Sequence, residues 1–344
     1  MATLTETAIF SKKASRWVGA GIIILIVLII LLISGKTIKN MILPPKAPPA
    51  TVAFGKLPKF DLSLGIKPPT VVSYDLETVS GALPISLPQS AKVFSIAFPE
   101  SSFGALEQVR VKASRAGFSS EPVEVLPGSA KFVDNSKKDK VLTIETASGN
   151  LVLFSNYLSN PEIITRKTKS VEDAIRIARN FFNNFDLDME EFPEKNIQTR
   201  KLRVDTGGLK ETLALSDTNL IEVVFGRADA DKLPILAAWE ETPQVWAFVS
   251  GDEIVAANLK IAKIQKFRFS TYPLKGVQKA YDDLKAQNAA FNKKAAGSQI
   301  AIREVTLGYI EGKSTEEFLQ PVYLFRGNEG FVAYVAAVAG DWTE

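Results

Sequence analysis

Residues 170–185 read SVEDAIRIARNFFNNF, and this stretch gives the clearest secondary-structure pattern in the chain. Ser170 is a residue type that accepts a backbone hydrogen bond at the start of a helix, and Asp173 in the first turn suits the positive end of the helix dipole. The apolar residues recur at three- and four-residue spacing and form one stripe: Val171, Ala174, Ile175, Ala178, Phe181, Phe182 and Phe185. The pattern predicts an amphipathic helix with one buried face.

This helix is expected to pack against a hairpin further along the chain. Residues 244–250 and 253–260 are two strand-like runs joined by Gly251-Asp252, a pair that favours a two-residue turn. Two more units repeat the arrangement, with helices at 103–116 and 276–292 and strand pairs at 140–146 with 151–155 and 320–325 with 331–338. The uneven spacing of the helices excludes a fixed-period solenoid, and strands and helices do not alternate strictly. The predicted fold class is α+β, made of helix-plus-antiparallel-hairpin units.

The last predicted strand is apolar on both faces. Phe331, Ala333 and Val335 lie on one side of it, and Val332 and Tyr334 lie on the other. A strand of this composition is expected to be covered on both sides. We therefore predict that the final hairpin is core and that Tyr323, Phe325, Phe331 and Val335 are buried.

The N-terminal region contains a long apolar segment. Residues 17–34 read WVGAGIIILIVLIILLIS without a charge, and at about 1.5 Å per residue they would extend roughly 27 Å, close to the thickness of a hydrocarbon core. They predict a transmembrane helix in contact with the lipid bilayer. The basic residues Lys12, Lys13 and Arg16 before it favour an uncleaved signal-anchor with a cytoplasmic N-terminus. A cleaved signal peptide remains the alternative.

A proline-rich segment follows the apolar one. Prolines stand at 44, 45, 48, 49, 58, 68 and 69, which favours extended backbone over helix or sheet and predicts a semi-rigid stalk. The predicted division of the chain is a cytoplasmic tail at 1–16, a transmembrane helix at 17–34, a stalk at 35–70, and three α+β units at 71–160, 161–272 and 273–344.

Composition excludes several functional classes. The 344 residues contain no His and no Cys, which removes Ser-His-Asp and Cys-His catalysis, Cys/His zinc sites and disulfides. With 46% hydrophobic and 23% charged residues the chain is too apolar to be disordered. Residues 1–60 carry +7 of formal charge, so the rest of the chain carries −4. Because a nucleic-acid binder would be expected to have its basic patch on the folded part, no nucleic-acid partner is predicted.

One short motif resembles a catalytic loop. Asp205-Thr206-Gly207 after an apolar run is typical of aspartic proteases, where two such aspartates share a proton. The motif occurs once, and the segment at 224–226 that resembles the protease's apolar-apolar-Gly element follows too soon. We interpret the residues, together with Gly208, as a turn between strands.

The remaining candidates favour structural roles. Residues 186–190 begin like a calcium loop, but Glu191 stands where that loop needs Gly, and the acids Asp229 and Asp231 are expected to be solvated. No phosphate-binding glycine loop is present. Three tryptophans are interpreted as packing residues rather than a sugar platform: Trp239, Trp246 and Trp342. No catalytic, cofactor-binding or metal-binding residue is therefore predicted.

Several segments resemble PepSY-type and YycI-like extracytoplasmic modules of bacteria. The resemblance lies in residues 170–178, 272–281, 305–309, 320–325 and 331–338. It implies a membrane-tethered, non-enzymatic module that modulates an envelope partner, and it carries over no functional residue because the matching positions are apolar or turn residues.

Two functions follow as expectations. The first is a single-pass, membrane-anchored extracytoplasmic interaction or regulatory protein that binds an envelope protein and has no catalytic activity. The second is a carboxylate-dependent envelope hydrolase, which needs only two acids at a suitable separation, and these need not be close in the chain. A buried cleft with two facing acids of raised pKa would favour the second.

Overall fold

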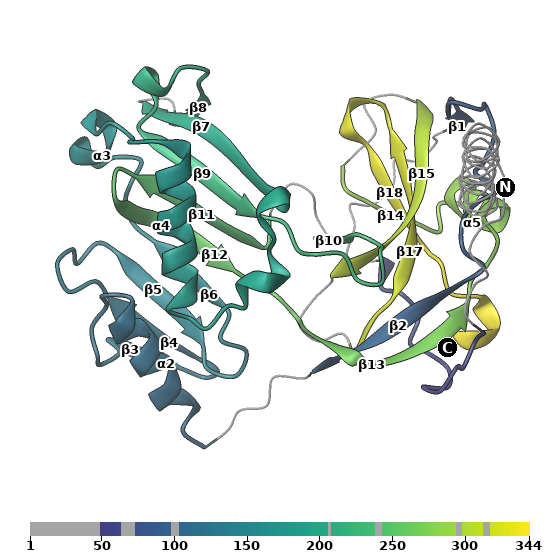
Figure 1. Ribbon diagram of the computed structural model, residues 1–344, viewed down its shortest axis with the longest axis horizontal. Coiled ribbons are helices and arrows are strands. Elements are labelled where there is room, and N and C mark those ends of the chain that lie inside the picture. Colours follow the sequence, from purple (N-terminus) through teal and green to yellow (C-terminus); the bar gives the residue numbers. More distant parts are fainter. Residues whose placement is uncertain are drawn as a thin grey trace, which may run out of the picture. The chain divides into compact units, whose positions relative to one another are not determined.

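The structure is a computed structural model, and it describes residues 49–62, 73–97, 103–205, 208–237, 243–293, 298–311 and 317–344. The chain divides into Met1–Pro48 with Ser86–Pro88 and into Pro49–Ile85 with Gln89–Glu344. All the helices and strands described below belong to the second unit (Figure 1). The predicted tail at 1–16 and transmembrane helix at 17–34 lie outside the described residues.

The largest sheet has nine strands, all paired antiparallel, in the order β3-β4-β5-β6-β12-β11-β9-β7-β8. Their bounds are β3 Glu124–Leu126, β4 Ser129–Val133, β5 Val141–Glu145, β6 Leu151–Phe154, β7 Ile197–Asp205, β8 Gly208–Glu211, β9 Leu220–Phe225, β11 Val245–Ser250 and β12 Glu253–Leu259. Helices α2 (Ala105–Arg115) and α4 (Val171–Asn183) lie on the same face of this sheet (Figure 1). The α+β class predicted from the sequence is confirmed.

Helix α4 forms as its sequence predicts. The Ser170 hydroxyl oxygen accepts a hydrogen bond from the Asp173 backbone N–H at 3.0 Å, which satisfies one unpaired donor at the helix start. The predicted stripe packs against the sheet, where Phe182 lies edge-on to Phe225 with ring centroids 5.5 Å apart. The hairpin of β11 and β12 also matches, and Gly251 has the positive φ of 60° that its turn requires.

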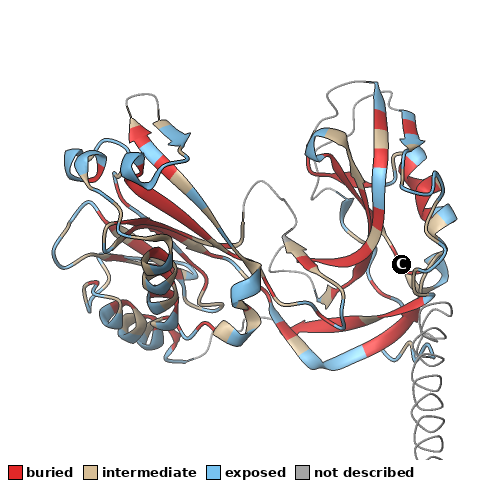
Figure 2. Cartoon of the chain, turned by 45° about the horizontal axis from the view of Figure 1, so that its top comes forward, coloured by how far each residue is buried: buried red, intermediate tan, exposed pale blue. Residues whose placement is uncertain are grey.

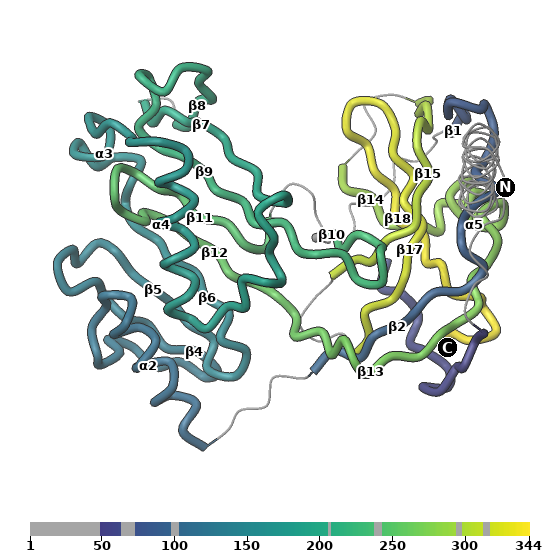
Figure 3. Tube along the Cα trace, in the orientation of Figure 1, coloured from purple at the N-terminus to yellow at the C-terminus, as the bar shows by residue number. Residues whose placement is uncertain are grey.

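Two smaller sheets hold the remaining strands. The six-stranded sheet contains β1 Ser73–Leu76, β10 Ile235–Ala237, β14 Ala290–Phe291, β15 Gln299–Glu311, β17 Pro321–Gly327 and β18 Val332–Ala336. The three-stranded sheet contains β2 Ser90–Ala97, β13 Lys263–Pro273 and β16 Phe318–Leu319, with β2 between the other two. Figure 3 shows β2 beside β13. The three predicted hairpins are antiparallel as expected, but both β1 and β10 pair with β15 in parallel, so the six-stranded sheet is mixed.

Short helices complete the described secondary structure. The α-helices α3 and α5 span Pro161–Thr165 and Val277–Lys285, and the 3₁₀ turns span Met189–Glu191, Glu194–Asn196, Leu215–Asp217, Asn328–Gly330 and Gly340–Trp342. Helix α5 packs on β18. It ends earlier than the predicted 276–292 because Gln287 has a φ of 63°, and Ala290 and Phe291 then pair with β18 as a strand.

The final hairpin is buried as predicted. Tyr323 and Phe331 are almost fully buried, and Phe325 and Val335 are completely buried. Strand β17 lies between β15 and β18, so neither of its edges is open. Figure 2 shows both strands of this hairpin as buried along most of their length.

The sheets do not follow the predicted units 71–160, 161–272 and 273–344. Strand β6 from the first unit pairs with β12 from the second, and β2 from the first pairs with β13 from the second and β16 from the third. Such pairings join segments more than a hundred residues apart, and local sequence patterns carry no signal for them. Each predicted boundary therefore separates strands that belong to one sheet.

Part of the predicted stalk at 35–70 belongs to the folded unit. Leu57 is fully buried and pairs in parallel with Thr343, and its backbone N–H donates to the Trp342 carbonyl at 2.8 Å. The Tyr272 hydroxyl donates to the Gly55 carbonyl at 2.8 Å. Residues 49–62 turn at Ala53-Phe54, where the Gly55 N–H donates to the Val52 carbonyl at 3.0 Å, and they lie against the C-terminal segment instead of forming a free, extended stalk.

Candidate functional site

The two faces of the nine-stranded sheet differ in how they are covered. Alternate side chains such as Phe132, Leu153 and Val223 pack against α2 and α4. On the opposite face, α3 contributes Ile163, which covers one end of the sheet. The buried side chains beneath it are Leu202, Val204, Leu220, Phe248, Val255 and Ala256.

The other end of this second face carries a row of side chains that we call the open face. Its members stand directly opposite one another on successive strands, an arrangement that points them to the same side: Thr143, Val152, Asn258, Trp246, Val224 and Gln198, with Phe154 beside them. Val152 is 52% exposed and Phe154 is 62% exposed. Trp246 is partly buried, and its ring lies 4.8 Å from that of Phe248. The centre of the open face is therefore accessible and largely apolar, with Asn258 among the apolar side chains and Thr143 and Gln198 at the two ends.

A cavity of about 470 Å³ adjoins the open face. Gln198 and Val224 contribute to both, and Leu236 of β10 and Arg326 of β17 line the cavity from the six-stranded sheet. Gln244 also lines it and donates a hydrogen bond from Nε2 to the Glu311 carbonyl at 3.1 Å. The cavity thus combines apolar walls with amide and guanidinium groups.

Arg227, which lines the same cavity, is the centre of a buried ion network that we call the Arg227 cluster. Its Nη1 lies 2.6 Å from Glu311 Oε1, and its Nη2 lies 2.6 Å from Glu191 Oε2. Nη1 also donates to the Ala262 carbonyl at 3.1 Å, while the Ala262 N–H donates to Glu311 Oε1. Lys266 Nζ lies 3.1 Å from Glu191 Oε1 at the exposed side. The cluster ties β9 and β15, which belong to different sheets, to the segment between β12 and β13.

The pKa values of the two carboxylates of the cluster are shifted in opposite directions. Burial raises the pKa of Glu311, and Arg227 offsets only part of this effect. Burial would also raise the pKa of Glu191, but Arg227 and Lys266 outweigh it and hold that pKa below its ordinary value. Glu311 Oε2 is buried without a hydrogen-bond partner among the described residues. Both carboxylates point to Arg227, so the guanidinium occupies the space between them.

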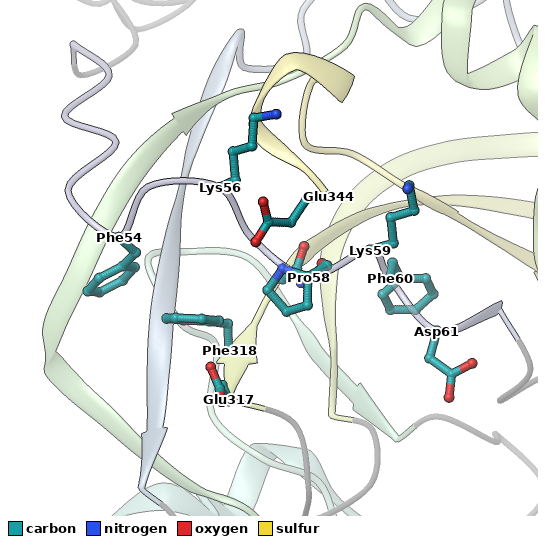
Figure 4. Close-up of a pocket in the computed structure, with 10 residues that line it drawn as sticks. Phe54, Lys56, Pro58, Lys59, Phe60, Asp61, Glu317, Phe318 and Glu344 are labelled. Atoms are coloured by element: carbon teal, nitrogen blue, oxygen red, sulfur yellow. The ribbon is translucent and has the colours of Figure 1, made fainter.

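A second cavity of about 540 Å³ lies between the 54–61 segment and residues 317–320. Figure 4 shows Phe54 and Phe318 at one end and Phe60 at the other, with Pro58 between them. The rings of Phe54 and Phe318 are 5.0 Å apart, and Gln320 Nε2 donates to the Pro58 carbonyl at 2.9 Å. Its charged residues are all exposed and of both signs: Lys56, Lys59, Asp61, Glu317 and Glu344. Because charges of both signs line this cavity and all of them are exposed, the cavity does not favour an anionic ligand over a cationic one.

The Asp-Thr-Gly motif lies at a hairpin turn. Asp205 ends β7 and stands opposite Gly208 at the start of β8, and its Oδ2 lies 2.7 Å from Lys210 Nζ. Thr206 and Gly207 lie outside the described residues. In the 224–226 segment, Phe225 packs in the core and Gly226 lies against the Asn196 carbonyl, which would meet an added Cβ at 2.7 Å. Both observations support the turn interpretation.

The acids considered as calcium ligands have other partners. Asp186 pairs with Lys112 at 3.2 Å and Arg115 at 3.1 Å, and the Asp188 side chain caps the turn that begins at Met189. Asp231 pairs with Lys92 at 2.9 Å, and Asp229 is exposed. No group of three or more acids that could hold a metal occurs among the described residues.

The tryptophans have different environments. Trp246 belongs to the open face and is half-buried: part of its side chain packs against the apolar cluster under α3, and the rest is accessible to solvent. Trp342 packs against Tyr272, with ring centroids 6.4 Å apart, as expected for a residue that covers the end of the chain's last strands. Trp239 lies outside the described residues.

Sequence reasoning missed the Arg227 cluster. Glu191 and Glu311 lie 36 and 84 positions from Arg227, and no spacing rule connects them. It also missed the open face, because residues 151–154 are all apolar and the sequence does not show which of them are exposed.

No helix in the part of the chain that the structure describes is long and apolar enough to cross a bilayer. No protein-family model matches the chain, and the comparison with curated proteins found no match. Among solved structures, the chain is similar to the Bacillus megaterium YpeB C-terminal domain, with 13% identity and a TM-score of 0.31, over 71% of this chain and 96% of that one. At this TM-score the similarity does not establish a common fold.

Proposed function

We propose that the chain is a membrane-anchored extracytoplasmic interaction or regulatory protein that binds an envelope protein through the open face and has no catalytic activity. The observation that carries the proposal is the accessible apolar row on the nine-stranded sheet, with Val152, Phe154 and Trp246 at its centre. An exposed apolar patch on a folded domain is a common sign of a protein-binding surface. The expected partner presents an apolar surface that covers this row.

The sequence supports the rest of the proposal. The uncharged segment 17–34 would anchor the chain, and the basic residues before it favour a cytoplasmic N-terminus and an extracytoplasmic folded unit. The absence of His and Cys removes most side-chain chemistry of nucleophilic catalysis. The resemblance to PepSY-type and YycI-like modules favours the same class of function.

Crosslinking in native membranes tests this proposal with a matched pair of variants. Val152 is 52% exposed on the open face, and Val111 is 51% exposed on the outer side of α2. Val152→Asp should reduce capture of the partner about tenfold or more, because a carboxylate would be buried without a counter-charge at the interface. Val111→Asp should leave capture unchanged. If both variants capture the partner equally well, the open face is not the binding surface.

A carboxylate-dependent hydrolase is the second candidate, and the raised pKa of Glu311 beside a cavity favours it. The pKa of Glu191 is lowered, and Arg227 lies between the two acids. Glycoside hydrolysis needs two carboxyl groups that face the same substrate bond. Hydrolysis of an envelope polymer by the parent chain that is lost in Glu311→Gln would favour this candidate over the first.

A further inference from the structure

Strand β13 contains a bulge of three residues. Gln265 stands opposite Ser95 on β2, and Phe269 stands opposite Phe94, the very next residue of β2. Lys266, Phe267 and Arg268 therefore have no partner on β2, and we call them the KFR bulge. Bulges of this kind re-aim side chains and are common next to functional sites.

The KFR bulge interrupts an otherwise buried strand. Ile264 before it and Ser270 after it are almost fully buried, whereas the Phe267 side chain is 100% exposed. Figure 2 shows the exposed stretch of β13 between two buried ones. Because the Phe267 ring is fully exposed, it contributes nothing to the packing of the fold, and water has access to its whole apolar surface.

Basic residues lie near Phe267 along the strand. Arg268 and Lys263 are exposed and form no ion pair within the described ranges. Lys266 is half-exposed and pairs with Glu191. Next along the strand, Phe269 is 43% exposed, with Lys92 Nζ 4.4 Å from its ring centroid. Lys92 also pairs with Asp231, so within the described ranges the bulge presents an exposed ring with two cations nearby along the strand that form no ion pair, Lys263 and Arg268.

This combination favours a lipid surface over a protein partner. One phenylalanine offers about 150–250 Å², whereas a stable protein interface needs about 800 Å² on each side. A bilayer interface accepts a single protruding ring between its headgroups, and anionic headgroups attract each nearby Lys or Arg enough to raise binding about fivefold.

We propose that the KFR bulge docks on anionic lipid headgroups and inserts Phe267 into the bilayer interface. The proposal rests on the proposed membrane anchoring, which would keep the folded unit near a bilayer. It adds a second, electrostatic contact with the same membrane. Charge complementarity between Arg268 and Lys263 and the headgroups identifies the ligand as anionic lipid.

The chain contains no Cys, so one substitution places a unique spin label in the full chain. Phe267→Cys is compared with Phe103→Cys, a second fully exposed phenylalanine whose neighbours from residue 98 to residue 108 include no Lys or Arg. Each labelled chain is reconstituted in vesicles that contain phosphatidylglycerol and in matched vesicles of phosphatidylcholine alone. The accessibility of the label to oxygen and to a water-soluble nickel chelate is then measured.

The label at 267 should gain oxygen access and lose nickel access only in the anionic vesicles. Salt near 1 M, where the screening length is about 3 Å, should reverse the effect, and Arg268→Gln should reduce the immersed fraction about fivefold. The label at 103 should stay in water throughout. A label at 267 that is as accessible to nickel as the one at 103 in the anionic vesicles would overturn the proposal.

Two further experiments distinguish a lipid ligand from a protein ligand, and the bulge from the transmembrane anchor. A benzophenone on the same Cys, activated in native membranes, should form lipid adducts, and an adduct only with an acidic protein would overturn the lipid assignment. If alkaline carbonate releases the chain from membranes, that result contradicts the proposed transmembrane anchor and leaves the proposal for the KFR bulge untouched. The label at 267 still tests the bulge in that case, because the released chain can be added back to anionic vesicles.

Discussion

Arg227 separates two carboxylates that would otherwise repel each other in a buried site. Arg227→Met removes the cation and leaves Glu191 and Glu311 without it, which should lower the free energy of unfolding by about 3–5 kcal/mol. Urea unfolding of residues 49–344 measures the change. Arg176→Met, which breaks an exposed pair with Asp173, should cost less than about 1 kcal/mol. Equal losses would show that the cluster is not buried in solution.

Glu253 gives a prediction with a defined pH dependence. Burial would raise its pKa, but hydrogen bonds from Lys137 at 2.6 Å and Arg166 at 3.0 Å, with Lys140 nearby, lower it below the ordinary 4.5. Because the folded pKa is the lower one, the stabilisation is complete above pH 4.5 and is lost as the pH falls through the folded pKa.

Glu253→Gln should therefore lower the free energy of unfolding by about 1.5–3 kcal/mol at pH 7, and the difference from the parent should shrink in acid. Denaturant unfolding at several pH values checks this. If the difference in the free energy of unfolding between Glu253→Gln and the parent does not change with pH, the variant loses packing and not a charge interaction.

At the level of residues, the sequence predicted roles that depend on local neighbours. Ser170 caps helix α4 by accepting a hydrogen bond from the backbone N–H of Asp173, three positions further on, and this spacing is visible in the sequence alone. The role of Arg227 depends on strands that meet only after folding, so no residue pattern near position 227 could reveal it.

Among the elements, the β17–β18 hairpin should tolerate no charge. Val335 is completely buried, so Val335→Asp must either desolvate a carboxylate or protonate it, and ending the chain at Gly327 would leave the ladder groups of β17 unpaired. Both changes should abolish cooperative unfolding or most of the soluble yield. Leu209→Asp on the exposed β8 serves as the control, with an effect within about 0.5 kcal/mol. If the Val335 variant unfolds like the parent, this hairpin is peripheral.

The 49–62 segment should contribute to stability as an element. Leu57 is fully buried among Val93, Tyr272 and Val338. Leu57→Ala should cost about 2–5 kcal/mol through lost burial and a residual cavity, whereas Val79→Ala at a fully exposed position should be close to neutral. Thermal or urea unfolding of residues 49–344 distinguishes the two. A neutral Leu57→Ala would restore the interpretation of this segment as a free stalk.

Helices and strands could be predicted where the sequence periodicity is strong, but the ends of some of them could not. The stripe of α4 placed its start correctly and its end within two residues, and the runs on either side of Gly251-Asp252 placed β11 and β12 within one residue at each end. The third helix was predicted to extend to residue 292, but Ala290 and Phe291 pair with β18 as a strand, and no local pattern indicates that pairing.

For the whole molecule, the predicted topology can be tested directly. A reporter fused after Glu344 should be active only outside the cytoplasm, because the basic residues precede the apolar segment 17–34. The readout is reporter activity with intact cells. Cytoplasmic activity would contradict the orientation, and release of the folded unit from washed membranes would support a cleaved signal peptide.

The sheet arrangement could not be predicted at this scale. Helix-plus-hairpin units are visible in the sequence because their parts are neighbours, but the partners of β2 lie at β13 and β16, far along the chain. Loop-closure entropy and side-chain packing select among many possible pairings, and neither leaves a mark in the local pattern.

The parallel pairing of Leu57 with Thr343 has a consequence for the order of folding. A chain that emerges from a ribosome or a translocation channel with its N-terminal side first presents Leu57 long before Thr343 exists on the far side. The nine-stranded sheet, whose strands all lie between Glu124 and Leu259, can form during that interval. The other two sheets can be completed only later, because β2 has to wait for β13 and β1 for β15, and until then these early strands are exposed to chaperones and proteases.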